Sequence, residues 1–157
     1  MSKEEQVIAS FRDLLNKLTW LNKPKMEKSL EGYKSSEVHC IEYIGKNTDP
    51  NVTKLAEAFY MTNGAISKLA KKLIKKGIIE NYQKPENKKE IYFRLTEQGK
   101  VIYKIHEKLH QEFQKRDKIA FEQVTEEEFD NMISFAEKYN KHLDAEIKKI
   151  SADIKSK

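Results

Sequence analysis

Two of the chain's four histidines, His106 and His110, lie four residues apart in the segment VIYKIHEKLHQEF. On a helix this spacing places both imidazoles on one face, one turn apart. Neutral imidazole is a good ligand for zinc, so the pair could hold a metal. Two polar side chains on a solvated helix surface would leave the same pattern, and a bare pair favours that second interpretation.

The segment from one histidine to the other, HEKLH, is formally the HExxH motif of zinc proteases, in which the glutamate acts as general base. Such an enzyme also needs a third ligand downstream and a substrate cleft. The sequence holds no phosphate-binding glycine loop and no nucleophile elbow. We therefore expect no enzyme, and a zinc hydrolase acting through HEKLH is the catalytic alternative.

A second group of residues suits nucleic acid. In the segment TNGAISK, Asn63 can pair with adenine, Lys68 with guanine, and the methyl group of Ala65 can meet a thymine methyl. A glycine there lets the backbone approach closely, and a helix start offers its amides to phosphate. The lysine-rich stretch KKLIKK follows, although a solvated helix face would look the same. The residues predicted to contact DNA here are Thr62, Asn63, Gly64, Ala65, Ser67, Lys68, Lys71 and Lys72.

Apolar residues at helical spacing predict four helices in the first half of the chain. The first covers about residues 3–21, before a loop marked by Pro24, and the second covers about residues 35–45. Asn51 and Thr62 are good N-caps for two short helices that a tight turn joins. These two short helices are the elements of a helix-turn-helix, with the lysine-rich segment on the second.

The period then changes to that of β-strands. GIIENY and IYFRLT are rich in β-branched and aromatic residues, and the charged loop QKPENKKE separates them, which predicts a hairpin, or wing. Thr96 can cap a long helix that runs to about Phe121, and Thr125 can open the last helix. The wing residues placed to reach DNA beside the helix-turn-helix are Lys84, Asn87, Lys88 and Lys89.

These elements predict a mostly α (α+β) fold, a winged helix-turn-helix with further helices at both ends. Residues 1–34 and 100–157 carry apolar stripes that a winged unit at residues 35–99 could not cover, so we expect them to form a dimerisation domain with a second copy. The formal charge of +5 agrees with a polyanionic partner. With one cysteine, no signal peptide and no long apolar run, we expect a cytoplasmic protein without membrane contact.

The chain resembles the MarR family of bacterial winged-helix regulators. The resemblance rests on VTKLAEAFYMTNGAISKLAKKLIKKGIIENY and on RLTEQGK, where Leu95, Thr96 and Gly99 stand as in the family's closing motif. It implies a homodimer that binds a pseudo-palindromic operator in double-stranded DNA, in most cases as a repressor. The family's wing tip usually carries an acid followed closely by arginine. Asn87 and Lys89 cannot form that bidentate pair, so we expect a floppier wing or a weaker minor-groove contact.

The resemblance also bears on the histidines. The zinc-responsive branch of the family carries a histidine at the place of His39 and a pair at the places of His106 and His110. Three imidazoles leave one tetrahedral position, which a carboxylate after the first helix, Glu27 or Glu31, could fill. Zinc would favour the DNA-competent state as far as it binds that state better. A small organic effector in the same crevice, or no effector, are the alternatives, and DNA binding requires no cofactor.

Three further expectations complete the sequence analysis. The branch's second metal site, built from cysteine and acids, is not expected, because Val38 and Ile105 occupy two of its places. Cys40 lies on an apolar helix face and is expected to be a buried thiol, whereas His142 is expected at the surface. A winged helix that contacts only other proteins is the remaining alternative, but its surface would not need lysines on both helix and wing.

Overall fold

The computed structural model describes residues 1–156, with side chains as far as Ser151. Over these residues the elements follow the order α1 (Lys3–Ser29), α2 (Ser35–Lys46), α3 (Val52–Phe59), α4 (Asn63–Lys75), β1 (Ile79–Lys84), β2 (Asn87–Leu95), α5 (Glu97–Asp117), the short 3-10 helix η1 (Lys118–Phe121) and α6 (Glu126–Ser156). The two strands pair antiparallel. This order confirms the predicted mostly α winged helix-turn-helix.

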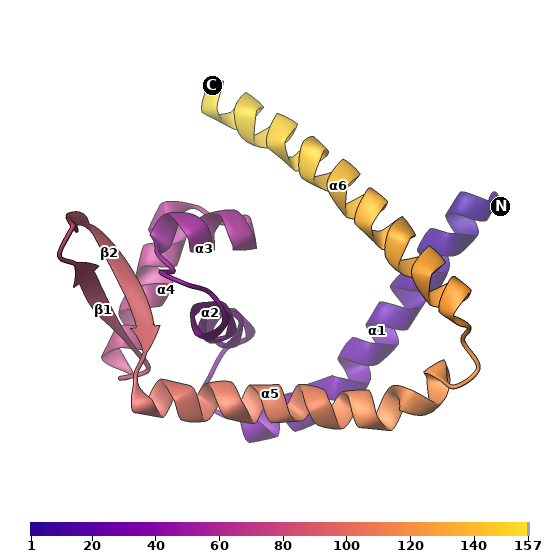
Figure 1. Ribbon diagram of the computed structural model, residues 1–157, viewed down its shortest axis with the longest axis horizontal. Coiled ribbons are helices and arrows are strands. Elements are labelled where there is room, and N and C mark those ends of the chain that lie inside the picture. The colour runs from indigo at the N-terminus through magenta and orange to yellow at the C-terminus, as the bar shows by residue number, and fades with distance from the viewer. Residues whose placement is uncertain (157) are drawn as a thin grey trace. The chain divides into compact units, whose positions relative to one another are not determined.

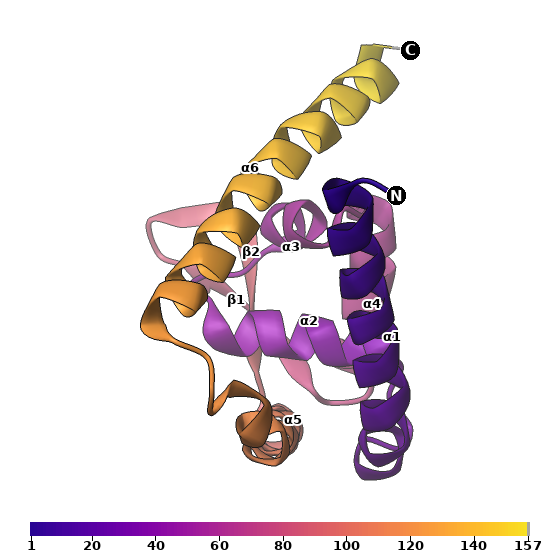
Figure 2. The same ribbon diagram turned by 90° about the vertical axis from the view of Figure 1, so that its right-hand side faces the viewer.

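The chain divides into two compact units, residues 1–114 and residues 115–157. The predicted boundaries near residues 34 and 99 concern roles in DNA binding and dimerisation, and they stay a prediction. In the first unit, α2, α3 and α4 gather beside the hairpin, and α5 begins directly after β2 (Figure 1). The second unit contains α6, which Figure 2 shows as one continuous helix.

The core of the winged unit comes from the apolar stripes of its helices and from the start of β1. Fully buried side chains on these elements include Ile41, Leu55, Ile66, Leu73 and Ile78. Because they come from α2, α3, α4 and the segment leading into β1, they fix the two helices of the helix-turn-helix against one another.

Side-chain caps fix where the two short helices begin. The Oδ1 atom of Asn51 accepts a hydrogen bond from the backbone N–H of Lys54 (2.9 Å), and Oγ1 of Thr62 accepts one from the N–H of Ala65 (3.1 Å). Both predicted N-caps are confirmed. Tyr60 ends α3 in the left-handed conformation, with φ 54°, and so makes the tight turn.

The segment RLTEQG joins the wing to α5 and holds the two together by hydrogen bonds and close packing. The Thr96 hydroxyl shares its one proton between the carbonyl oxygens of Gly77 (2.6 Å) and Ile78 (3.0 Å), and it accepts from the N–H of Gly99 (3.1 Å). A Cβ atom on Gly99 would lie 2.1 Å from the Ile78 carbonyl oxygen. Glycine at this position therefore permits the close approach of α5 to the start of the hairpin.

Two predicted boundaries were wrong. The first helix does not stop near residue 21, because α1 continues through Pro24 to Ser29. Its last turns pack Met26 and the following Leu30 against Leu109 and Phe113 of α5, which compensates for the proline. The predicted loop QKPENKKE is mostly strand, since Lys84 pairs with Asn87 and only two residues form the turn.

No helix in the described part of the chain is long and apolar enough to cross a membrane.

Candidate DNA interface and histidine cluster

The predicted reading segment occupies the exposed face at the start of α4. Ile66, Leu69, Ala70 and Leu73 are buried on the opposite face, which directs the rest of the helix outwards. Of the predicted contact residues on or beside α4, Ala65 and Ser67 are half-buried, and the exposed ones are Thr62, Asn63, Gly64, Lys68, Lys71 and Lys72. The structure thus places amide, methyl, hydroxyl and ammonium groups together on one helix, as base and phosphate contacts require.

The four predicted wing residues fall into two groups. Asn87, Lys88 and Lys89 are exposed at the tip, where Oδ1 of Asn87 accepts from the backbone N–H of Lys89 (3.2 Å). Lys84 is half-buried, and its ammonium already pairs with the carboxylate of Asp49. The tip lysines are therefore open to a phosphate, whereas the ammonium of Lys84 forms an ion pair within the fold.

An ion pair between exposed Lys76 and buried Glu37 ties the far end of α4 to α2. Nζ of Lys76 donates to Oε2 of Glu37 (2.9 Å) and to the carbonyl oxygen of Gly32 (2.9 Å), and it lies 4.9 Å from the centre of the Tyr33 ring. Burial opposes the ionisation of Glu37, but hydrogen bonds from Lys76 and from the Lys34 N–H, with the charge of Lys76, lower its pKa. Sequence reasoning treated this lysine only as part of a basic helix end.

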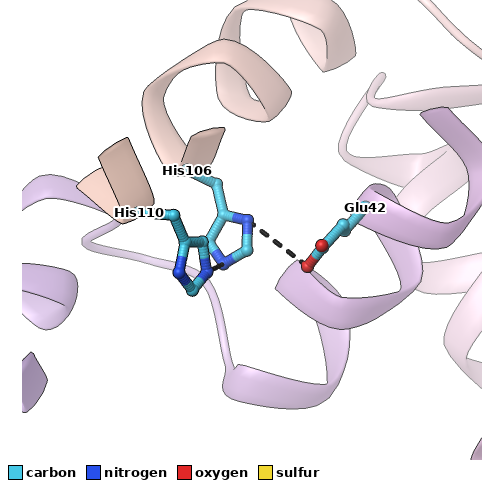
Figure 3. Close-up of side chains that lie close together, drawn as sticks. All are labelled: Glu42, His106 and His110. Atoms are coloured by element: carbon cyan, nitrogen blue, oxygen red, sulfur yellow. Dashed lines mark hydrogen bonds and ion pairs between the residues drawn. The ribbon is translucent and has the colours of Figure 1, made fainter. Parts of the chain in front are cut away.

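The histidine pair lies together with an acid of α2. Nε2 of His106 is 3.0 Å from Nε2 of His110, and Nδ1 of His106 is 3.5 Å from Oε2 of Glu42 (Figure 3). One ligand atom from each residue can be chosen so that all three lie within 4.8 Å of one another. These residues line a cavity of about 250 Å³, which is also lined by Lys46 and Tyr103.

The surroundings of His106 favour its neutral form. Its side chain is buried, whereas His110 is exposed. Burial lowers the pKa of His106, and the charge of His110 lowers it further, while the Glu42 carboxylate acts in the opposite sense. The imidazole is thus favoured in its neutral form, which is the form that binds a metal. His39 is exposed on α2, and its charge also lowers the pKa of His106, so the two lie within electrostatic reach.

The carboxylate beside the histidines is Glu42, which sequence reasoning missed. Glu27 lies within α1, where it pairs with Lys23 (3.8 Å), and Glu31 is exposed in the turn after that helix. Neither belongs to the cluster found among the described side chains. The available signal was the three-residue spacing from His39 to Glu42, which places both on one face of α2.

The two other sequence expectations on cysteine and histidine are confirmed. Cys40 is fully buried, and burial, with the nearby charge of Glu37, raises the pKa of its thiol to about 12. His142 is exposed on α6.

An exposed polar helix face and a lysine-tipped hairpin, held on one core, define a winged helix-turn-helix protein of the DNA-binding kind. The sequence model of the MarR family matches residues 34–91. The regulator PchR of Bacillus subtilis is 31% identical over 152 residues, which cover 85% of this chain and 88% of PchR. The regulator YhjH of the same organism is 37% identical over 108 residues, and the match covers 69% of this chain and 59% of YhjH.

Among solved structures, FabT of Streptococcus pneumoniae in complex with DNA superimposes with a TM-score of 0.76 at 19% identity. The match covers 91% of this chain and 99% of FabT. At that identity the likeness concerns the fold alone, and it agrees with the winged unit and long helices described above. The chain belongs to the MarR family of DNA-binding transcriptional regulators.

Proposed function

We propose that this regulator binds a pseudo-palindromic operator as a homodimer and acts as a repressor. The observation that carries the proposal is the outward face of α4, on which Asn63, Gly64 and Lys68 are all exposed. In a helix-turn-helix this part of the second helix enters the major groove. The exposed tip lysines of the wing, Lys88 and Lys89, supply the flanking contacts.

The homodimer is supported by apolar side chains that stay exposed in the single chain. On α1 they include Phe11, Leu14, Leu15 and Trp20. On α6 they include Met132, Ile133, Phe135 and Leu143. Stripes of this size at helical spacing are costly to leave in water, and a second copy of the same helices would cover them.

Selection of duplexes from a random-sequence library tests the DNA proposal. We expect the wild-type protein to enrich related sequences with two half-sites about one helical turn apart. On the selected duplex, Asn63→Ala should weaken binding by about 1–3 kcal/mol and relax the preference at one base position. Lys88→Ala should weaken binding to all duplexes and lower the salt slope by about 0.9.

Lys17→Ala is the matched control, because Lys17 is an exposed lysine of α1 paired with Asp13. It should change neither the preference nor the salt slope. If the wild type retains no duplex at low salt, the chain acts through protein contacts instead. If it retains duplexes without any sequence preference, the proposed operator recognition is wrong.

We further propose that a zinc ion modulates DNA binding at the cluster of Glu42, His106 and His110, with exposed His39 of α2 as the added ligand that the sequence predicts. The residues fit the metal, since tetrahedral zinc keeps its ligand atoms roughly 3–3.5 Å apart and the two Nε2 atoms are 3.0 Å apart. Glu42 faces Nδ1 of His106 (3.5 Å), where a carboxylate orients a metal-binding imidazole. Bound zinc would join α2 of the winged unit to α5.

Competition with a chromophoric chelator tests this site on metal-free protein. We expect one zinc per chain, binding lost in His106→Ala, and an affinity lower by about 10–100-fold in Glu42→Gln. His142→Ala is the matched control, because it removes an exposed histidine of α6. Binding that survives His106→Ala, or that His142→Ala abolishes, would contradict the site. Operator binding should then be compared with and without zinc, since zinc acts only through its different affinity for the two states.

A further inference from the structure

Asp49, in the loop between α2 and α3, accepts hydrogen bonds from residues of two elements, strand β1 and helix α3. Its Oδ1 accepts from the phenol of Tyr82 (2.6 Å), and its Oδ2 accepts from Nζ of Lys84. Its backbone carbonyl accepts from Nζ of Lys54 on α3 (2.9 Å). One residue therefore connects strand β1 of the wing with the first helix of the helix-turn-helix.

The backbone of Asp49 adopts a conformation that few residues tolerate. Its φ is 49°, in the left-handed region, and the next residue is Pro50. A residue before proline ordinarily prefers extended backbone, and among non-glycine residues Asp and Asn are the most tolerant of left-handed backbone. Such a conformation persists where surrounding contacts determine it. The contacts to Tyr82 and Lys84 are of that kind.

The two residues after Asp49 also bind the hairpin. The Pro50 carbonyl accepts from the N–H of Phe93 (2.9 Å), and Nδ2 of Asn51 donates to Oε1 of Glu90 (2.8 Å). Asn51 is at the same time the N-cap of α3. Residues 49–51 thus attach both the wing and the helix-turn-helix, so their contacts determine how far the wing tip lies from α4.

Contacts among the neighbouring hairpin residues agree with a fixed anchor. The rings of Tyr82 and Tyr92 lie 5.5 Å apart across the strands, and Nζ of Lys84 lies 5.3 Å from the centre of the Tyr92 ring. Burial, with the hydrogen bond and charge of Asp49, raises the pKa of the Tyr82 phenol to about 12. The phenol therefore keeps its proton and the hydrogen bond over the whole neutral range.

We propose that Asp49 is the positioning residue of the wing, which fixes Lys88 and Lys89 relative to α4 when the protein is on DNA. The anchor holds β1 from outside the hairpin, from the middle of the strand (Tyr82) to its turn end (Lys84), whereas the acid–arginine pair of the resembling family lies within the wing tip itself. Lys84 is a part of the anchor, because its ammonium pairs with the Asp49 carboxylate. The inference rests on the proposed contact of the wing with DNA beside the half-site.

Asp49→Asn tests the anchor, because asparagine tolerates the same backbone but cannot pair with an ammonium as a carboxylate does. On the duplex selected by the wild type, hydroxyl-radical protection of the flanking minor groove should be lost. Methylation protection of major-groove guanines should remain. The salt slope should fall by up to about 1.8, which corresponds to the two tip lysines. A variant that was merely less stable would keep the slope of the folded fraction.

Two further variants make the test specific. Tyr82→Phe removes one donor without changing charge, and it should lose part of the flanking protection. Combined with Asp49→Asn in a double variant, it should add little to the effect of Asp49→Asn alone, because both act on one network. Glu80→Gln makes the same charge change as Asp49→Asn, on an exposed pair with Arg94 of β2, and should keep the protection. Flanking protection and slope that persist in Asp49→Asn, or an equal loss in Glu80→Gln, would overturn the anchor. A wild type that selects no duplex would instead overturn the DNA proposal, before any variant is compared.

Discussion

Gly99 is the residue at which close packing of α5 against the wing leaves no room for a side chain. A Cβ atom there would lie 2.1 Å from the Ile78 carbonyl oxygen and 3.3 Å from Cβ of Leu95. Gly99→Ala must therefore move α5 or the start of β1, and we expect it to destabilise the fold by about 3 kcal/mol. Urea unfolding of wild type and variant, followed by circular dichroism, measures the difference.

The same substitution at Gly64 provides the control. A Cβ atom there would meet nothing closer than Oγ1 of Thr62 at 4.0 Å. Because alanine is the better helix former, Gly64→Ala should stabilise the fold by about half a kcal/mol. On DNA the added methyl group should hinder the approach of the backbone, so affinity should fall while stability rises. An equal loss of stability in both variants would contradict the packing argument.

The cap and the exposed residues of the candidate DNA interface were predictable from sequence because their placement depends on local spacing. The N-cap Thr62 and the exposed Asn63 and Lys68 follow from the helical period of one segment. Glu42 and Asp49 were not predictable in the same way. Their partners, His106 and Tyr82, lie far along the chain and are brought near only by tertiary packing.

At the scale of elements, the ion pair of Glu37 and Lys76 makes the joint between α2 and α4 sensitive to acid. The pKa of Glu37 is lowered in the folded chain, so its ionised form stabilises the fold above the ordinary value of 4.5 and loses this effect as the pH falls through the lower folded value. We expect Glu37→Gln to lower stability by about 1–2 kcal/mol at neutral pH. Below about pH 4.5 the difference from wild type should shrink, because the wild-type carboxyl also becomes neutral.

Thermal unfolding at neutral pH and at acid pH, on both proteins, measures this difference. Glu97→Gln is the control, because the side chain of Glu97 is 92% exposed and its pairing with Lys100 should contribute little. A stability difference for Glu37→Gln that stays constant with pH would show that its cause is packing and not charge.

The wrong boundaries at the element scale share a physical cause. Pro24 removes a hydrogen-bond donor, and propensity alone ends a helix there. Contacts of Met26 and Leu30 with α5, and the ion pair of Lys25 with Glu112 (2.7 Å), keep the last turns helical. In the same way, the charged segment after Tyr82 had no strand pattern of its own. Pairing with the opposite strand, and the Asp49 contact, extend β1 to Lys84.

At the scale of the whole molecule, the proposed dimer would carry two copies of α4. Dimerisation would then decide whether these two helices bind DNA as a single unit. Leu14 lies on the exposed apolar stripe of α1 and is 56% exposed in the single chain. If a second copy covers it, Leu14→Lys removes one buried leucine from each subunit. The dimer dissociation constant should rise by about a thousandfold, since the two leucines together contribute about 4 kcal/mol. Sedimentation over a range of concentrations measures this constant, and Asn16→Lys, at an exposed polar position of α1, is the control.

The consequence for DNA follows from effective concentration. In a dimer, once one α4 helix has bound its half-site, the α4 helix of the second subunit is held close to the other half-site. This high effective concentration adds affinity without any new contact. Leu14→Lys should therefore lose most of its affinity for the paired operator at concentrations where it is monomeric. Its affinity for a single half-site, set by α4 and the wing within one chain, should stay close to that of the wild type. If the variant instead stays dimeric, α1 does not contribute to the interface in the way proposed. If it becomes monomeric and still binds the paired operator like the wild type, the two reading helices act independently.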